Sequence, residues 1–61
     1  MPIVTVEVFE GKSVEQKSGP VKDITDAVCK NFKVPADTVT IVIYDVKREN
    51  LGKAGKLASE F

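Results

Sequence analysis

The sequence predicts an α+β fold in which a strand, a long helix and a second strand follow one another, with a short hairpin arm at the end. Three observations lead to this prediction: a β-branched segment at residues 3–9, an amphipathic segment at residues 14–32 and a second apolar segment at residues 39–46. Two strands joined by a helix at this spacing pair in parallel through a right-handed crossover. The 61 residues leave room for a single domain spanning residues 1–61.

The first predicted strand is Ile3–Phe9 (IVTVEVF), which is rich in β-branched and aromatic side chains. Side chains alternate between the two faces of a strand, so one face of this strand is aliphatic and the other is mixed. The aliphatic face carries Val4, Val6 and Val8, and the mixed face carries Ile3, Thr5, Glu7 and Phe9.

The predicted helix follows a turn at residues 10–12. Ser13 with Gln16 three residues later is the pattern of a capping box, in which each side chain satisfies a free backbone amide of the other residue. The helix is expected to reach about Phe32. Its apolar spacing predicts one buried stripe made of Val21, Ile24, Val28 and Phe32.

Two alternatives are open at Gly19-Pro20, inside the helical pattern. An interior proline lacks an amide donor and clashes one turn back, which costs about 3 kcal/mol. Either a single kinked helix runs from residue 14 to residue 32, or a short first turn ends and a new helix begins near Pro20 with Ser18 as its cap. The kinked single helix is the favoured alternative.

The second predicted strand, Val39–Val46 (VTIVIYDV), follows a helix break at residues 34–37 and is apolar on both faces. One helix can cover only one face of a two-stranded sheet. A second copy of the chain would cover the other face, so at least a dimer is expected. Beyond this strand, two glycines within residues 51–58 predict a tight hairpin or arm.

Composition excludes several function classes. Nine basic and nine acidic side chains cancel, so no net field would attract nucleic acid or an anionic membrane. One cysteine and no histidine exclude an internal disulfide and argue against structural zinc, which leaves oligomerisation as the support for so small a core. Cys29 is interpreted as a packing residue. A lone cysteine without an export signal is typical of a cytoplasmic protein.

Without histidine, the sequence has no Ser-His-Asp triad and no histidine base. Gly11-Lys12-Ser13 resembles the end of a phosphate-binding loop, but Val6 stands where that motif needs its first glycine. Lys12 still lies near the free amides of a helix start, where a substrate carboxylate would fit; the alternative is an ordinary solvated turn lysine. Three carboxylates are interpreted as solvated charges: Asp23, Asp26 and Asp37.

Pro2 is the remaining catalytic candidate. Removal of Met1 is efficient ahead of a small residue, and it would leave a secondary amine at the start of the first strand. An α-amino group titrates near about 7.7–8.0, and desolvation or a nearby cation would lower this pKa. Such a base suits the abstraction of a proton next to a carbonyl.

Short segments along the whole chain, in order and without internal gaps, resemble the 4-oxalocrotonate tautomerase family. They are Pro2-Ile3-Val4, Glu10-Gly11-Lys12-Ser13, Glu15-Gln16-Lys17, Ile24-Thr25-Asp26-Ala27, Val34-Pro35, Val39-Thr40-Ile41-Val42-Ile43, Asn50-Leu51-Gly52 and Gly55-Lys56-Leu57-Ala58-Ser59.

The resemblance implies a β-α-β tautomerase fold, with protomers that pair into a four-stranded sheet in a dimer and three dimers that form a homohexamer. It also implies an isomerase that converts 2-hydroxymuconate-like dienols to conjugated 2-oxo acids. In that reaction the amine of Pro2 acts as the general base and shuttles the proton. No cofactor and no metal is implied.

Three site positions depart from the family's pattern. Lys12 stands where an arginine usually grips a substrate carboxylate, so the charge is kept but the bidentate fork is lost. Thr40 stands where a second arginine from a neighbouring subunit binds the 2-oxo end of the substrate, and Leu51 replaces an aromatic wall. Arg48 or Lys47 is the candidate for a replacement cation.

Two functions are therefore expected as alternatives. Pro2 with Lys12 favours an enzyme, a proline-based tautomerase with altered specificity. Thr40 favours a non-catalytic member that binds small molecules or serves as a structural oligomer.

Overall fold

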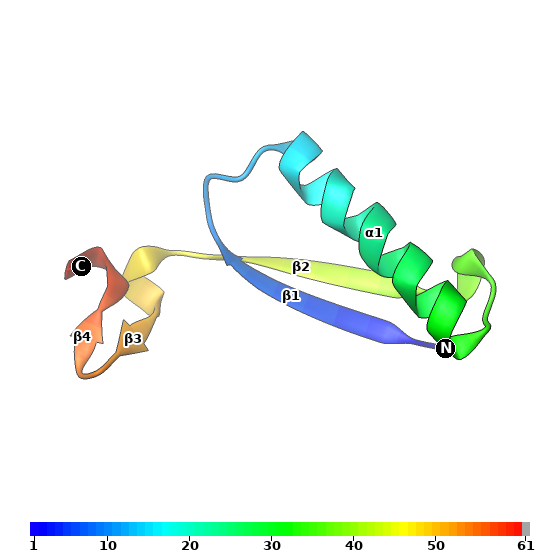
Figure 1. Cartoon of the computed structure of the whole chain (residues 1–61). Coiled ribbons are helices and arrows are strands. Elements are labelled where there is room, and N and C mark those ends of the chain that lie inside the picture. The colour runs from blue at the N-terminus through cyan, green and yellow to red at the C-terminus, as the bar shows by residue number, and fades with distance from the viewer. Residues whose placement is uncertain (61) are drawn as a thin grey trace.

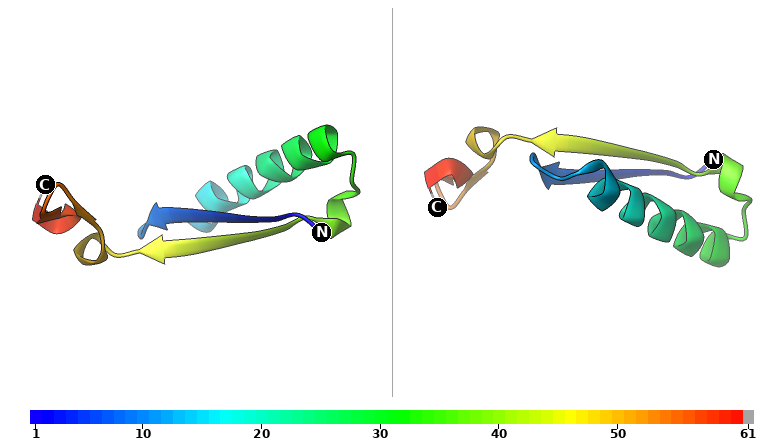
Figure 2. Two further views of the ribbon diagram at one scale, coloured as in Figure 1. Left: turned by 90° about the horizontal axis from the view of Figure 1, so that it is seen from below. Right: turned by 90° about the horizontal axis from the view of Figure 1, so that it is seen from above.

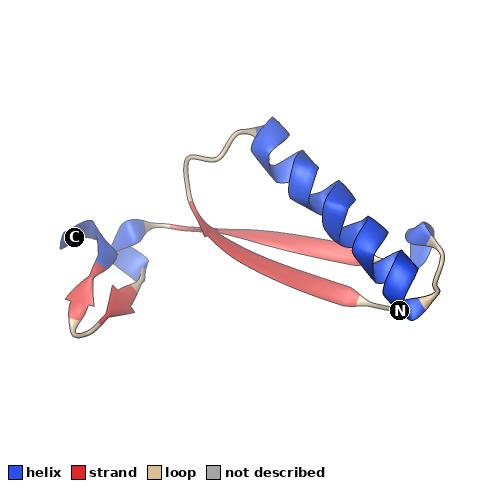
Figure 3. Cartoon of the chain, viewed as in Figure 1, coloured by secondary structure: helices blue, strands red, loops and turns tan. Residues whose placement is uncertain are grey.

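The computed structural model describes residues 1–60, which form a helix packed on one face of a two-stranded sheet and a small hairpin beyond one end of that sheet (Figure 1). The predicted α+β class is confirmed (Figure 3). In chain order the helix and strands are β1 (Ile3–Phe9), α1 (Val14–Phe32), β2 (Thr40–Val46), β3 (Gly52–Lys53) and β4 (Lys56–Leu57). Three 3-10 turns lie at Ala36–Thr38, Arg48–Asn50 and Ala58–Glu60.

Strands β1 and β2 pair in parallel, with Ile3 opposite Thr40 and Phe9 opposite Val46. The parallel pairing predicted from the sequence is confirmed. Strand β2 starts one residue later than expected, because the amide of Val39 donates to the carbonyl of Ala36 (3.1 Å) and closes the preceding turn. Residues opposite each other in a parallel pair share a face. The helix side carries Val4 with Ile41, Val6 with Ile43, and Val8 with Asp45.

Helix α1 is unbroken from Val14 to Phe32 and contains Pro20, so the single helix is confirmed over the two-helix alternative. The predicted capping box is also present: the amide of Gln16 donates to Ser13 Oγ (3.1 Å), and the amide of Ser13 donates to Gln16 Oε1 (2.9 Å). The helix ends at Lys33, whose left-handed backbone (φ 57°) lets its amide donate to the carbonyl of Cys29 (2.9 Å).

The apolar stripe of the helix is narrower than predicted. Ile24 and Val28 are half-buried against the sheet, whereas Val21 and Phe32 are exposed, Phe32 by 67%. A helix with its side chains is about 10–12 Å wide, while two strands lie only about 4.8 Å apart. The sheet therefore covers the centre of the apolar stripe but not its two ends. The prediction of four buried residues is wrong for the single protomer.

The hairpin arm predicted from the glycines is present, because β3 and β4 pair antiparallel with Gly52 opposite Leu57. It folds back on the turn before it: the amide of Ala58 donates to the carbonyl of Leu51 (2.8 Å). Ala58, 2% exposed, is the one fully buried apolar residue within the described part of the chain. This anchoring fixes residues 48–51 at the end of the sheet.

The protomer is long and flat, with extents of 43 × 23 × 13 Å. Figure 2 shows the hairpin standing off the end of the sheet that is opposite the N-terminus. The outer face of the sheet, away from the helix, carries exposed apolar side chains such as Ile3 (66%) and Tyr44 (54%). None of the helices within residues 1–60 combines the length and the hydropathy that a membrane crossing needs.

Candidate active site

Pro2 and Thr40 lie together at one end of the sheet. The amide of Thr40 donates to the carbonyl of Pro2 (3.0 Å), which extends the ladder between β1 and β2 by one bond. Pro2 is half-buried, while Met1 before it is exposed by 89%. While Met1 is attached, the nitrogen of Pro2 is a tertiary amide and has no lone pair available for a proton. This end of the protomer thus holds the predicted base and the neutral residue at the position of the missing arginine.

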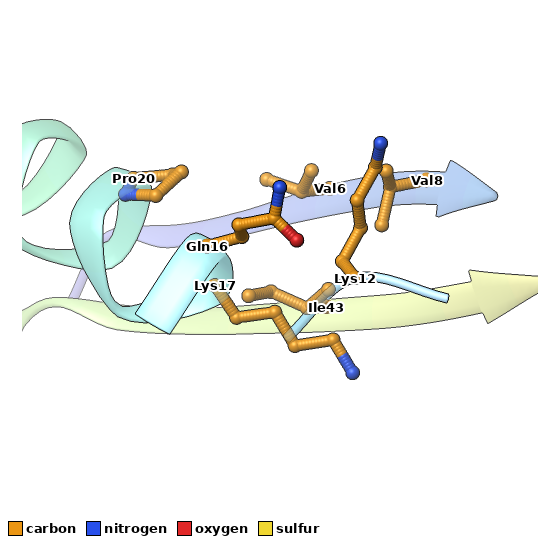
Figure 4. A pocket seen from close by; sticks show the side chains of 7 residues that line it. All are labelled: Val6, Val8, Lys12, Gln16, Lys17, Pro20 and Ile43. Carbon is orange, nitrogen blue, oxygen red and sulfur yellow. The ribbon is translucent and has the colours of Figure 1, made fainter. Parts of the chain in front are cut away.

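Lys12 lies at the other end, in a hollow of about 370 Å³ between the helix start and the sheet. Gly11 makes the turn that carries it, with a φ of 103° that favours glycine. Lys17 lines the same hollow, but its ammonium pairs with Asp45 (3.0 Å) and points away from that of Lys12 (Figure 4). Of these two lysines, only Lys12 lacks an ion pair within residues 1–60. The remaining lining residues are Val6, Val8, Gln16, Pro20 and Ile43.

A second hollow, of about 280 Å³, lies at the same end of the sheet and contains Leu51. Phe9 lines it as well, and the guanidinium carbon of Arg48 lies 4.3 Å from the centre of the Phe9 ring. This distance is well within the range of a cation–π contact. The other lining residues are Glu7, Val8 and Val46.

Phe9 was not among the residues predicted for the site. Its sequence signal was an aromatic side chain at the end of the first strand, three residues before Lys12. The strand pattern predicts only that Phe9 lies on the mixed face of the strand. The contact between Arg48 and the ring joins residues 39 positions apart in sequence. A local sequence pattern cannot predict such a contact.

The predicted site residues thus form two groups at opposite ends of the paired strands β1 and β2. Pro2 and Thr40 lie at the start of the paired strands, where Thr40 is opposite Ile3, whereas Lys12, Arg48 and Leu51 come after the strands end. Seven paired residues at about 3.3 Å per step separate the groups by about 20 Å. A single protomer therefore does not bring Pro2 and Lys12 to one small substrate, and within one chain Arg48 cannot stand in for a cation at Thr40.

Neither end offers a set of metal ligands. Within residues 1–60, no three His, Cys, Asp or Glu side chains are grouped so that they could hold an ion. Cys29 lies half-buried near the end of the helix, and its interpretation as a packing residue stays a prediction. The chemistry that the site residues offer is that of an amine, cations and apolar walls.

Comparison with known proteins places this arrangement in a family. A sequence model described as "Tautomerase enzyme" matches residues 2–60, nearly the whole chain. The chain belongs to the tautomerase enzyme family. It is 30% identical over 60 residues to a 2-hydroxymuconate tautomerase from Pseudomonas putida, a match that covers 98% of this chain and 95% of that protein.

Solved structures of tautomerases agree with this fold. A 4-oxalocrotonate tautomerase isozyme from Methylibium petroleiphilum is 37% identical, with a TM-score of 0.92 over 97% of this chain and 92% of that one. A heterohexamer 4-oxalocrotonate tautomerase from Chloroflexus aurantiacus is 27% identical, with a TM-score of 0.91 over 98% and 97% of the two chains. The predicted resemblance to 4-oxalocrotonate tautomerases and the predicted tautomerase fold are confirmed, and the family supports an isomerase-type enzyme.

Proposed function

We propose that this tautomerase converts 2-hydroxymuconate-like dienols to conjugated 2-oxo acids, with the amine of Pro2 as the base once Met1 is removed. The observation that carries the proposal is the place of Pro2: half-buried, at the start of β1 and tied to β2 through Thr40. The family supplies the reaction class, and the similarity to a 2-hydroxymuconate tautomerase supports the substrate class.

The reaction is a transfer of one proton. The amine of Pro2 takes the proton of the enol hydroxyl, and the electrons of that O–H bond form the new carbonyl. The conjugated double bonds shift, and a carbon further along the chain accepts the proton back from the Pro2 ammonium. Nothing is oxidised or reduced, so Pro2 alone balances the step.

The base must be neutral when the substrate arrives. Two causes would hold the pKa of the Pro2 amine below the ordinary α-amino range: desolvation in the assembled pocket, and the charge of Lys12 brought in by a second chain. Each unit of depression corresponds to about 1.4 kcal/mol that disfavours the ammonium form. Activity is then expected to rise with pH through the lowered pKa, as the free amine forms.

The site is completed by a second copy of the chain, because about 20 Å separates Pro2 from Lys12 within one protomer. In the assembly, Lys12 would seat a substrate carboxylate beside the free amides of the helix start. Leu51 would form part of the apolar wall. Thr40, close to Pro2, adds no charge at the reacting end, so the preference for dicarboxylates over monocarboxylates is expected to be weak.

The surface of the protomer supports such an assembly. The chain exposes 4892 Å², whereas a monomeric protein of 6.6 kDa exposes about 3,900 Å². The excess is roughly 1,000 Å², more than the roughly 800 Å² that one partner buries in a standard interface. The heterohexamer relative shows that a member of this fold can form a hexamer, and a homohexamer built as a trimer of dimers is proposed here.

The test compares the same chain with and without Met1 on one enol substrate, 2-hydroxymuconate. The Met1-free protein should be active, and the protein that retains Met1 should be inactive with an unchanged far-UV circular dichroism spectrum, because its Pro2 nitrogen is an amide. Pro2→Ala keeps a primary amine and should retain partial activity. Equal rates with and without Met1 would remove Pro2 as the base.

Thr40 favours a second candidate function, a non-catalytic oligomer that binds small molecules. Its neutral side chain stands next to Pro2, at the end where the reaction would take place. Under this alternative, the Met1-free protein binds enol acids but does not turn them over. The assay described above separates the two functions.

A further inference from the structure

The arm, defined here as residues 47–60, is a small folded unit that makes its own hydrogen bonds. The amide of Asn50 donates to the carbonyl of Lys47 (2.8 Å) and closes the first turn. The amide of Ala58 donates to the carbonyl of Leu51 (2.8 Å) after the chain has passed through the paired strands β3 and β4. Because these bonds lie within the arm, they keep its shape but do not set its angle to the sheet.

Polar contacts between the arm and the rest of the protomer are scarce. The last bond of the ladder between β1 and β2 runs from the amide of Glu10 to the carbonyl of Val46 (3.0 Å), just before the arm begins. Within residues 1–60, no hydrogen bond or ion pair joins the arm to residues 1–46. The contact that does join them is that of Arg48, whose guanidinium carbon lies 4.3 Å from the centre of the Phe9 ring.

This contact lies next to the hollow of Leu51, at the end of the outer face of the sheet. Phe9 and Val46 are paired across the strands and belong to the sheet side of the hollow, whereas Leu51 is its one residue from the arm. The hollow of about 280 Å³ therefore depends on the angle at which the arm holds Leu51. Arg48 begins the turn that ends at Leu51, where the amide of Leu51 donates to the carbonyl of Arg48 (3.4 Å).

We propose that Arg48 is a positioning residue: its contact with the Phe9 ring fixes the angle of the arm and so holds Leu51 as a wall of the site. An arginine suits this role, because its planar guanidinium stays charged and packs on aromatic rings. Arg48 acts through Leu51 and binds no carboxylate itself. The role of Leu51 as a wall for substrate rests on the proposed function, whereas the angle of the arm does not.

The first experiment measures the angle between the arm and the sheet from residual dipolar couplings of backbone amides in the Met1-free oligomer. In the parent, the arm and the strands β1 and β2 should fit one alignment tensor. In Arg48→Gln and in Phe9→Leu, each part should still fit a tensor of its own, because its internal bonds remain, but one common tensor should no longer fit both. Phe9→Tyr keeps the aromatic ring and should behave as the parent does.

The second experiment links the angle of the arm to the reaction through steady-state kinetics on 2-hydroxymuconate. Arg48→Gln should raise KM by roughly two- to fivefold, the change expected for loss of one exposed cation–π contact. Its kcat should stay within about twofold of the parent's, because the wall contributes binding and not proton transfer. In a Leu51→Ala background, which lacks the wall, Arg48→Gln should raise KM no further, since the two residues act through one contact.

Lys53→Gln is the matched control, because it removes a positive charge from the same arm at a lysine that makes no cation–π contact within residues 1–60. It should leave the common tensor intact and change KM by less than about twofold, as exposed charges do. A common tensor that still fits in Arg48→Gln would overturn the proposal. Additive effects of Arg48→Gln and Leu51→Ala on KM would overturn it as well, because Arg48 would then bind substrate directly. An arm released by Arg48→Gln in an oligomer that turns over no enol would instead overturn the proposed function and confirm that Arg48 places the arm.

Discussion

Lys12 brings charge to the helix start, where the capping box of Ser13 and Gln16 leaves other amides of the first turn available. Arg48, in the turn after the second strand, contacts Phe9 and does not line the hollow of Lys12. Under the proposed function, a substrate carboxylate would meet this single cation, Lys12, beside the free amides of the helix start.

Lys12→Ala should lower kcat/KM. The expected loss of transition-state stabilisation is roughly 2–3 kcal/mol, the cost of a lost charge-assisted contact. The measurement is steady-state kinetics of the Met1-free protein on 2-hydroxymuconate and on a monocarboxylate enol such as phenylenolpyruvate. Lys17→Ala is the control, because Lys17 lines the same hollow but pairs with Asp45. Equal turnover in Lys12→Ala and the parent would exclude Lys12 from the site.

Among the elements, helix α1 contains the residue least suited to its conformation, an interior proline. Pro20 offers no amide, so the carbonyl of Gln16 lacks its helical donor, and nothing in the sequence pattern around it compensates. The helix nevertheless continues to Phe32, because both of its ends are capped and its central apolar residues rest on the sheet.

Pro20→Ala should therefore stabilise the protein, by about 1–3 kcal/mol, because it restores the missing bond. The readout is the urea midpoint at a fixed protein concentration, since assembly contributes to stability. Gly19→Ala is a useful comparison: the added methyl group meets no atom within 4 Å and should contribute about 1 kcal/mol. A less stable Pro20→Ala variant would mean that the ring packs usefully in the hollow of Lys12.

Elements set by neighbouring residues were predictable from sequence, and contacts across the fold were not. The bounds of β1 and the capping box at Ser13 follow from residues a few positions apart. The exposure of Phe32 depends on the width of the two-stranded sheet. The contact of Arg48 with the Phe9 ring depends on the path of the chain after β2. The separation of Pro2 from Lys12 required the strand register, which a single sequence does not contain.

At the scale of the whole molecule, the isolated protomer lacks a core. Its radius of gyration is 14.6 Å, whereas a compact chain of this length has about 10.5 Å. The outer face of the sheet is apolar and exposed, as Ile3 and Tyr44 show. The stability of this protein is therefore expected to depend on its concentration.

Sedimentation or light scattering at micromolar concentration should show at least a dimer, and a hexamer under the proposed assembly. Tyr44→Lys places a charge on the outer face opposite Glu7, an acceptable neighbour within the sheet, and should weaken the assembly. Ser18→Lys makes the same charge change on the exposed helix and should leave the assembly intact. A folded monomer of the parent at this concentration would contradict the expectation.

The distance between the two ends of the protomer also bears on how genes for such a chain can diverge. After a duplication, one copy could lose Pro2 and the other Lys12, and neither product alone would form a complete site. Mixed oligomers would still be active, because each proposed site takes Pro2 from one chain and Lys12 from another. When the two copies assemble at random in equal amounts, both residues are intact in about one site in four. Two damaged genes would then be retained together, each useless without the other, and the oligomer would become a mixed one by necessity.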